Sequence, residues 1–168
     1  HVIFELLDYS SPHKVRMEPA NLNELISRVL GLMRHNFNEA CIQVEEILSD
    51  DIEPVRLDGP KMEQVFINLF LNAISVMQKG GKLTVRTNTM HMTNTGSNVS
   101  SAMTELFRIG DKIVVVEVLD TGKGLSKDDE TKAFDPFYST KRMGRGLGLA
   151  SVLGIVKGHS GAIGVEPR

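Results

Sequence analysis

EQVFINLFLNAISVM, residues 63–77, is the stretch of sequence that decides the fold. Apolar side chains point in almost every direction around the helix that it predicts, and a helix that is apolar all round is mostly buried. Gln64, Asn68 and Asn72 nevertheless recur every four residues and form one narrow polar stripe, which Ser75 extends. A buried amide without a partner costs about 1–3 kcal/mol. The stripe therefore belongs to an internal hydrogen-bonded network, to a partly wet helix face, or to the wall of a ligand cavity.

Helices and strands follow one another along the rest of the chain. We expect helices at 21–36, 60–78 and 147–157, the end of a helix at 1–9, strands at 42–48, 82–89, 113–119 and 162–166, a short extended piece at 55–57, and irregular stretches at 90–107 and 126–145. Asn21, with Glu24 three residues later, is typical of a helix N-cap, and Pro60 suits a helix start. Residues 113–119 are apolar and mostly β-branched, which predicts a central strand buried on both faces. The order predicts an α+β fold, a two-layer sandwich with helices packed on one face of a mixed sheet.

Composition narrows the class of protein. The 168 residues carry a net charge of −2 and are 41% hydrophobic and 24% charged, as in an ordinary globular domain. The near-zero charge argues against nucleic-acid binding through a broad basic face. The single cysteine, Cys41, precludes an intramolecular disulfide and fits a reducing compartment, and no apolar run approaches the roughly 18 residues of a membrane span. Because the chain begins with His1 rather than Met, we expect a piece of a longer protein.

Two glycine-rich segments suit the close approach of a ligand. DTGKG, residues 120–124, places a carboxylate and two permissive glycines directly after a predicted strand, so that backbone can approach a flat or charged molecule; the same pattern also makes a tight turn. GRGLGL, residues 144–149, opens a predicted helix. Glycines at a helix start leave N–H groups available to an anion such as phosphate, although the Gly-Lys-Ser/Thr ending of a Walker loop is missing.

The segment FDPFYSTK, residues 134–141, sets three aromatic residues and a proline in an otherwise polar loop, with Lys141 followed by Arg142. Aromatic residues in a loop usually anchor it, so we expect Phe134 and Phe137 to pin this loop to the core. A hinged lid over a ligand would use the same anchors, with the basic residues reaching the ligand.

Taken together and in this order, the four segments resemble the ATP-binding catalytic domain of sensor histidine kinases, which belongs to the group shared with gyrase, Hsp90-type chaperones and MutL-type repair ATPases. EQVFINLFLNAISVM is similar to the N box, DTGKGL to the first glycine box, FDPFYSTK to the F box and GRGLGLA to the second glycine box. The resemblance runs from about Asn21 to the end and implies the Bergerat, or GHKL, fold. It also implies two parts: residues 1–12 as the end of a dimerisation helix with its linker, and residues 13–168 as the catalytic domain with its last strand truncated.

The resemblance implies roles for individual residues. Asn72 would coordinate the Mg²⁺ that bridges the phosphates of ATP, and Asp120 would accept a hydrogen bond from the adenine amino group. Gly122 and Gly124 would let the loop close on the base. The lid and the phosphate-facing helix start would include Phe134, Lys141, Gly144, Arg145, Gly146, Leu147 and Gly148, and the cations Lys141, Arg142 and Arg145 would offset phosphate charge.

The residue at position 68 distinguishes ATP-hydrolysing members of this group from histidine kinases. ATP-hydrolysing relatives carry a glutamate four residues before the metal-binding asparagine, as a base toward water, whereas Asn68 cannot take a proton. Asn68 and Asn72 are therefore the expected catalytic residues of a protein histidine kinase, which works chiefly by positioning and charge neutralisation. The resemblance implies an acceptor histidine that lies on a dimerisation helix and is followed by an acidic residue. Because His13 precedes Lys14 and His35 precedes Asn36, we expect the acceptor to lie outside this chain. An ATPase clamp of the same group and a nucleotide-free interaction module are the alternatives.

The resemblance also implies the setting of a bacterial two-component signalling system. The partners would be a dimerisation and histidine-phosphotransfer domain of the same protein and a downstream response regulator, with no nucleic acid. The full-length protein would be a homodimer. For this fragment by itself, a monomer is an alternative. We expect a cytoplasmic location, which is compatible with membrane anchoring of the parent protein.

Overall fold

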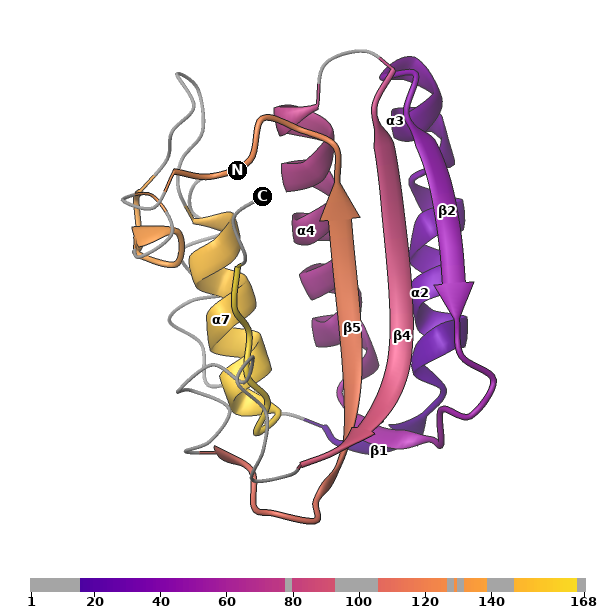
Figure 1. Cartoon of the computed structure of the whole chain (residues 1–168), viewed down its shortest axis with the longest axis vertical. Coiled ribbons are helices and arrows are strands. Elements are labelled where there is room, and N and C mark those ends of the chain that lie inside the picture. Colours follow the sequence, from indigo (N-terminus) through magenta and orange to yellow (C-terminus); the bar gives the residue numbers. More distant parts are fainter. Residues whose placement is uncertain are drawn as a thin grey trace.

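The structure, a computed structural model, describes residues 16–77, 80–92, 106–126, 129, 132–138 and 147–165. Their elements run in the order β1 (Glu18–Ala20), α2 (Leu22–Leu32), α3 (Arg34–Glu39), β2 (Gln43–Leu48), β3 (Val55–Leu57), α4 (Gly59–Val76), β4 (Lys82–His91), β5 (Lys112–Asp120) and α7 (Gly148–Gly158). Helices α2 and α4 lie on the same side of the main sheet, and α7 lies beside α4 (Figure 1). The α+β fold with helices on one face of a mixed sheet is thus confirmed. None of the helices in the described part of the chain is long and apolar enough to cross a lipid bilayer.

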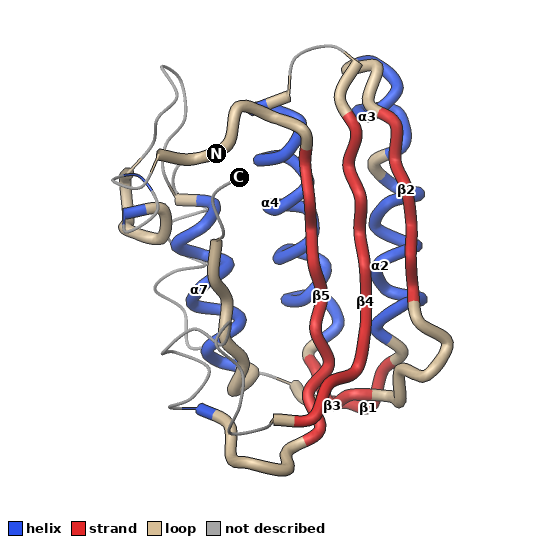
Figure 2. Tube along the Cα trace, in the orientation of Figure 1, coloured by secondary structure: helices blue, strands red, loops and turns tan. Residues whose placement is uncertain are grey.

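The main sheet has the order β2-β4-β5 among the described residues (Figure 2). β2 pairs with β4 in parallel, with Gln43 opposite Lys82, and the chain between the two strands includes α4. β5 returns antiparallel to β4, with Leu83 opposite Asp120. β1 and β3 form a separate antiparallel pair. This register places Asp120 at the end of the sheet where β4 begins.

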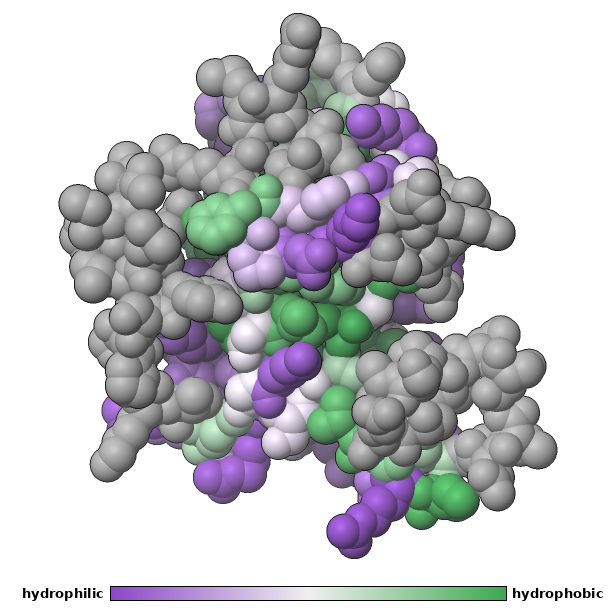
Figure 3. All heavy atoms as spheres, turned by 90° about the vertical axis from the view of Figure 1, so that its left-hand side faces the viewer, coloured by the Kyte–Doolittle hydropathy of each residue, from purple (hydrophilic) through white to green (hydrophobic). Residues whose placement is uncertain are grey.

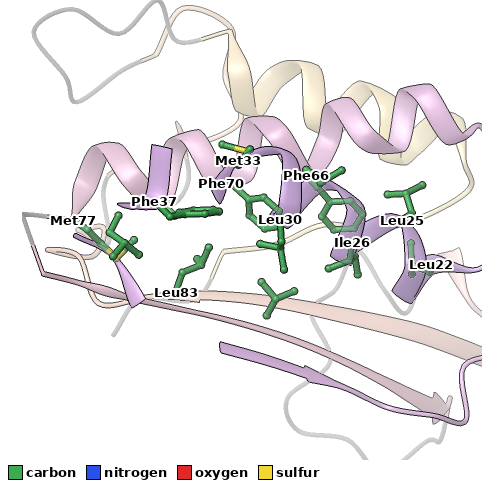
Figure 4. Packing of buried hydrophobic residues seen from close by; sticks show 14 of the residues in the cluster. Leu22, Leu25, Ile26, Leu30, Met33, Phe37, Phe66, Phe70, Met77 and Leu83 are labelled. Carbon is green, nitrogen blue, oxygen red and sulfur yellow. The ribbon is translucent and has the colours of Figure 1, made fainter. Parts of the chain in front are cut away.

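The core lies between the sheet and the helices α2, α3 and α4. Phe70 of α4 has no exposed surface, and its ring packs against Phe66 at a centroid distance of 6.0 Å and edge-on against Phe37 at 6.1 Å (Figure 4). The buried cluster consists of Leu22, Leu25, Ile26, Val29, Leu30, Met33, Phe37, Ile42, Leu57, Phe66, Phe70, Ala73, Met77, Leu83 and Val85. The apolar face of the stretch that decides the fold is therefore buried, as its pattern predicts.

Helices α2 and α4 both begin with a capping side chain, of which only the cap at Asn21 was predicted from the sequence. The Asn21 side chain accepts hydrogen bonds from the backbone N–H groups of Asn23 (3.0 Å) and Glu24 (3.3 Å). At α4 the cap is Asp58, whose Oδ1 accepts from the N–H of Lys61 (3.1 Å), and Pro60 lies in the first turn. A side-chain oxygen at this position satisfies an N–H group that has no partner within the helix.

Three expectations about the helices and strands are wrong. The helix expected at 21–36 breaks at Met33, where φ is −92° and ψ is 5°, and α3 resumes in a direction that brings Phe37 against Phe70. Packing in the core thus overrides helix continuity. The strand expected at 162–166 is not formed over residues 162–165, which enter no ladder among the described residues.

The third wrong expectation concerns the strand at 113–119, which is β5. β4, not β5, is the central strand of the described sheet. Val114, Val116 and Val118 pack against the core, but Glu117 on the other face is exposed. β-branched residues favour any strand, so their abundance did not reveal that the face of β5 away from the core, which carries buried Ile113 and exposed Glu117, is only partly covered.

Candidate functional site

Three of the segments singled out in the sequence meet at one place: the second half of α4, the loop after β5 and the start of α7. Gly148, the first residue of α7, lies beside Asn72, since a Cβ at Gly148 would stand 3.7 Å from Asn72 Nδ2. Gly122 in the loop lies against Val76, one turn further along α4. The structure therefore brings Asn72, Gly148 and the loop at 120–124 to the same end of the molecule.

The loop after β5 turns back on its own carboxylate. Asp120 Oδ1 accepts the backbone N–H of Gly122 at 2.8 Å. A Cβ at Gly122 would stand 2.7 Å from that oxygen and 2.9 Å from the Val76 carbonyl oxygen, distances that a real side chain does not tolerate. Gly124 has a φ of +70°, which L side chains rarely adopt. Both glycines are thus required for the shape of the loop, which presents the Asp120 carboxyl group next to the end of α4.

Thr121 fixes this loop to the sheet, a role that the sequence reasoning missed. Its hydroxyl oxygen accepts the Lys82 N–H at 2.8 Å, and its own N–H donates to the Lys82 carbonyl at 3.1 Å. The hydroxyl also donates to the sulfur of Met77 at 3.8 Å. The available signal was a hydroxyl residue directly after the last strand residue, where it can continue the ladder for one more step.

The polar stripe of α4 is half-buried rather than enclosed. Gln64, Asn68 and Asn72 each have intermediate exposure, whereas Ser75 is exposed and donates its hydroxyl to the Asn72 carbonyl at 2.6 Å. Leu71 next to the stripe is 46% exposed. Figure 3 views the molecule from the side that carries α7, where hydrophobic atoms lie among hydrophilic ones. The stripe therefore borders accessible space, which agrees with a partly wet helix face and with the wall of a ligand cavity and argues against a fully enclosed network.

The F-box segment is only partly anchored. Phe134 is half-buried, but Phe137 is 70% exposed and has a φ of +68°. The expectation that Phe137 pins the loop to the core is wrong, because Phe137 lies in a turn of left-handed backbone that leaves its ring in solvent. Tyr138 is held instead: its hydroxyl donates to Asp129, and this bond, followed by the one from Ser126, lowers the pKa of the Asp129 carboxyl group.

The start of α7 has the features of an anion site as far as it is described. Leu147 is the N-cap residue and provides no side-chain hydrogen bond, and Gly148 follows it. N–H groups in the first turn of a helix have no partners within the helix and favour negative charge. The other predicted residues of this region, Lys141, Arg142, Gly144, Arg145 and Gly146, lie outside the described residues, as do residues 1–12.

The chain matches a known protein family over the segments that form the candidate site. A family described as "Histidine kinase-, DNA gyrase B-, and HSP90-like ATPase" matches residues 57–168, which includes α4, the loop after β5 and α7. The sensor histidine kinase ZraS of Salmonella typhi is 31% identical over 165 residues, which are 98% of this chain but only 31% of ZraS. The chain thus spans less than a third of that relative.

Solved structures share the fold. The catalytic domain of the histidine kinase ThkA, in a nucleotide-free form, superposes on this chain with a TM-score of 0.67 at 26% identity. The match covers 85% of this chain and 81% of the ThkA chain. Full-length ShkA, in complex with AMPPNP, has a TM-score of 0.76 at 22% identity, over 99% of this chain and 32% of ShkA.

Proposed function

The chain belongs to the histidine kinase-, DNA gyrase B- and HSP90-like ATPase family, and from this we propose that it is the catalytic part of a sensor histidine kinase. It would bind ATP between α4, the loop after β5 and α7, and transfer the γ-phosphate to a histidine on a dimerisation domain of the same protein. The observation that carries the proposal is the meeting of Asn72 with Gly148 and of Gly122 with Val76. A response regulator would then receive the phosphoryl group.

The loop after β5 would hold the adenine. Asp120 Oδ1 is oriented by the N–H of Gly122, so its other oxygen, Oδ2, would accept a hydrogen bond from the exocyclic amino group. Thr121 ties the loop to Lys82, which keeps the carboxyl group in place before the ligand arrives. Preorganised polar groups of this kind reduce the ordering cost of binding.

The phosphates would lie between Asn72 and the start of α7. The N–H groups that follow Leu147 would face them, because a helix start favours anions. Asn72 offers an amide oxygen, which suits Mg²⁺, a hard cation that keeps several waters and takes few protein ligands besides phosphate. The described residues contain no group of three or more His, Cys, Asp or Glu that could hold a metal, so they fit an ion held mainly by the nucleotide. Such an ion would neutralise charge on the phosphates.

The identity of residue 68 bears on whether the chain transfers the phosphoryl group to a protein or hydrolyses ATP. It precedes Asn72 by one turn of α4 and is half-buried, but its amide cannot accept a proton from water. Position 68 therefore supplies no base to activate water. This supports transfer of the γ-phosphate to a protein side chain over the ATP hydrolysis that would drive a clamp.

Binding is tested first, by calorimetry with ADP and with a non-hydrolysable ATP analogue in the presence and absence of Mg²⁺. Asp120→Asn should abolish binding of adenine nucleotide while the fold is retained. The matched control is Asp51→Asn, an exposed position after the end of β2, whereas Asp120 lies at the end of the sheet where β2 and β4 begin. Unchanged affinity in Asp120→Asn would refute the adenine site, and absence of binding by the unmodified chain would favour the interaction module.

The reaction is tested by mixing the chain with labelled ATP and a separately produced dimerisation domain. Label on the acceptor histidine would support the kinase. Steady release of phosphate by the chain alone would favour the ATPase clamp instead.

A further inference from the structure

His159 joins the far ends of the two helices that carry the proposed site. It is the C-cap residue of α7, and its imidazole Nε2 accepts the backbone N–H of Asp58, the N-cap of α4, at 2.9 Å. Its Nδ1 stands 2.8 Å from the carbonyl oxygen of Ile155. The side chain is half-buried, and it lies 101 positions from Asp58 in the sequence.

The two partners dictate the state of the ring. A backbone carbonyl only accepts and a backbone N–H only donates, so Nδ1 must carry the proton and Nε2 must be free of one. His159 is therefore the neutral Nδ1–H tautomer in this arrangement. A protonated Nε2 would meet the Asp58 N–H with a second donor and would break the bridge.

Asp58 extends the junction to a third segment. Its Oδ1 caps α4 at Lys61, and its Oδ2 accepts the backbone N–H of Arg16 at 2.9 Å. The Arg16 N–H, and then that of Lys61, hold the pKa of the Asp58 carboxyl group below its usual range against the opposing effect of burial. The start of α4, the end of α7 and the chain just before β1 thus share one cluster of hydrogen bonds.

A pocket that is partly open to solvent lies beside this cluster. A cavity of about 400 Å³ is lined by Arg16, Glu18, Asp58, Gly59, Pro60 and Lys61. The lining that the structure describes contains no residue of α7, and the hydrogen bond from the Asp58 N–H to His159 Nε2 links the two helix ends directly.

The distances along the helices connect this junction to the site. At about 1.5 Å per residue, Asn72 lies about 21 Å along α4 from Asp58, and Gly148 lies about 16 Å along α7 from His159. The two helices are antiparallel neighbours (Figure 1), joined at one end by the imidazole and meeting at the other where Gly148 approaches Asn72. A change of spacing at the His159 end changes the angle of α7 and therefore moves its start relative to Asn72.

We propose that His159 is a positioning residue: its neutral imidazole fixes the end of α7 to the start of α4 and thereby holds Gly148 against Asn72 for nucleotide binding. The inference rests on the proposed function, because it assigns to His159 the alignment of the two helices that form the same nucleotide site. It requires no contact between His159 and the nucleotide.

The test compares two substitutions of similar size. His159→Gln places a side-chain oxygen near the position of Nε2 and can still accept from Asp58, whereas His159→Phe keeps a ring but has no acceptor. We expect Mg²⁺-ADP to bind His159→Phe about tenfold more weakly than the unmodified chain, about 1.4 kcal/mol, and His159→Gln to recover most of the affinity. The control is Ile26→Val in the buried core at α2, which should lower the melting temperature and leave the affinity unchanged.

Two further measurements do not need nucleotide. The ¹⁵N spectrum of the unmodified chain should show His159 with a protonated Nδ1 and an unprotonated Nε2. In the absence of ligand, the Gly148 amide resonance should shift in His159→Phe and stay in place in Ile26→Val. If His159→Phe does not fold, His159→Asn, whose side chain is too short to reach Asp58, replaces it in each comparison.

The outcomes separate the two proposals. If the unmodified chain does not bind ADP, the proposed function fails, and the Gly148 resonance still tests the alignment. If the unmodified chain binds ADP and His159→Phe binds it equally well, or if His159→Gln is weakened as much as His159→Phe, the positioning role is overturned. The same holds if the ¹⁵N spectrum shows the proton on Nε2.

Discussion

A single methyl group at Gly122 should disturb the adenine end of the proposed site, because three atoms already occupy its place. A Cβ there would stand 2.7 Å from Asp120 Oδ1, 2.8 Å from Val76 Cγ2 and 2.9 Å from the Val76 carbonyl oxygen. Favourable contacts between carbon atoms lie at about 3.5–4.0 Å, so each is far too short. The carbonyl belongs to the backbone at the end of α4 and moves only with the helix. The Asp120 carboxyl group must therefore rotate and lose its hydrogen bond to the Gly122 N–H.

Overpacking of this kind costs about 1–3 kcal/mol. We expect Gly122→Ala to lower the free energy of unfolding by that amount in urea denaturation, and to weaken Mg²⁺-ADP at least about tenfold in calorimetry, because the adenine would lose an oriented acceptor. Gly154→Ala is the control: a Cβ at this position in α7 meets nothing within 4 Å, and alanine favours a helix over glycine by about 0.5–1 kcal/mol. Gly154→Ala should be slightly more stable and bind normally. Equal stability and equal affinity of Gly122→Ala and the unmodified chain would refute the reasoning.

Three other outcomes are expected. Phe70→Ala should lower the free energy of unfolding in urea by about 3–5 kcal/mol, since the ring is fully buried; a loss below 1 kcal/mol would contradict the core assignment. The lowered pKa of Asp58 contributes stability that is present above the unfolded value of about 3.9 and is lost as the pH falls through the folded value. Urea denaturation from pH 7 to pH 3 should therefore show a shallower acid dependence for Asp58→Asn, which keeps a capping side chain, and parallel curves would disprove this. Asn68→Glu should introduce phosphate release by the chain alone in a coupled assay, and no release would show that a base at this position is insufficient.

Features set by near neighbours in the chain could be predicted from the sequence. The cap at Asn21 needs only the residues up to Glu24, and the apolar pattern around Phe70 needs only one helix. The glycine at position 122 was also predictable as a requirement of a tight loop, although the clash with Val76 that makes it necessary involves a residue of another element.

Features set by distant residues could not be predicted in the same way. Phe137 is a local exception, because the left-handed turn at this residue leaves its ring exposed, whereas an aromatic side chain by itself predicts burial. The place of β5 in the sheet depends on what covers each face, which composition does not reveal. His159 shows no local motif, and its partner Asp58 is identified only when the two helices are side by side.

The parallel pairing of β2 with β4 has a consequence for how the chain folds. Gln43 meets Lys82 only after the intervening chain, including α4, has been brought back across the sheet. Closing so long a loop costs entropy before any strand contact repays it, and such non-local pairing slows folding. Residues 80–92 must then accept partners on both sides, from β2 and from β5. β4 should consequently be the strand whose amide protons exchange last, and the proposed site between α4, the loop after β5 and α7 should form only after the sheet has closed.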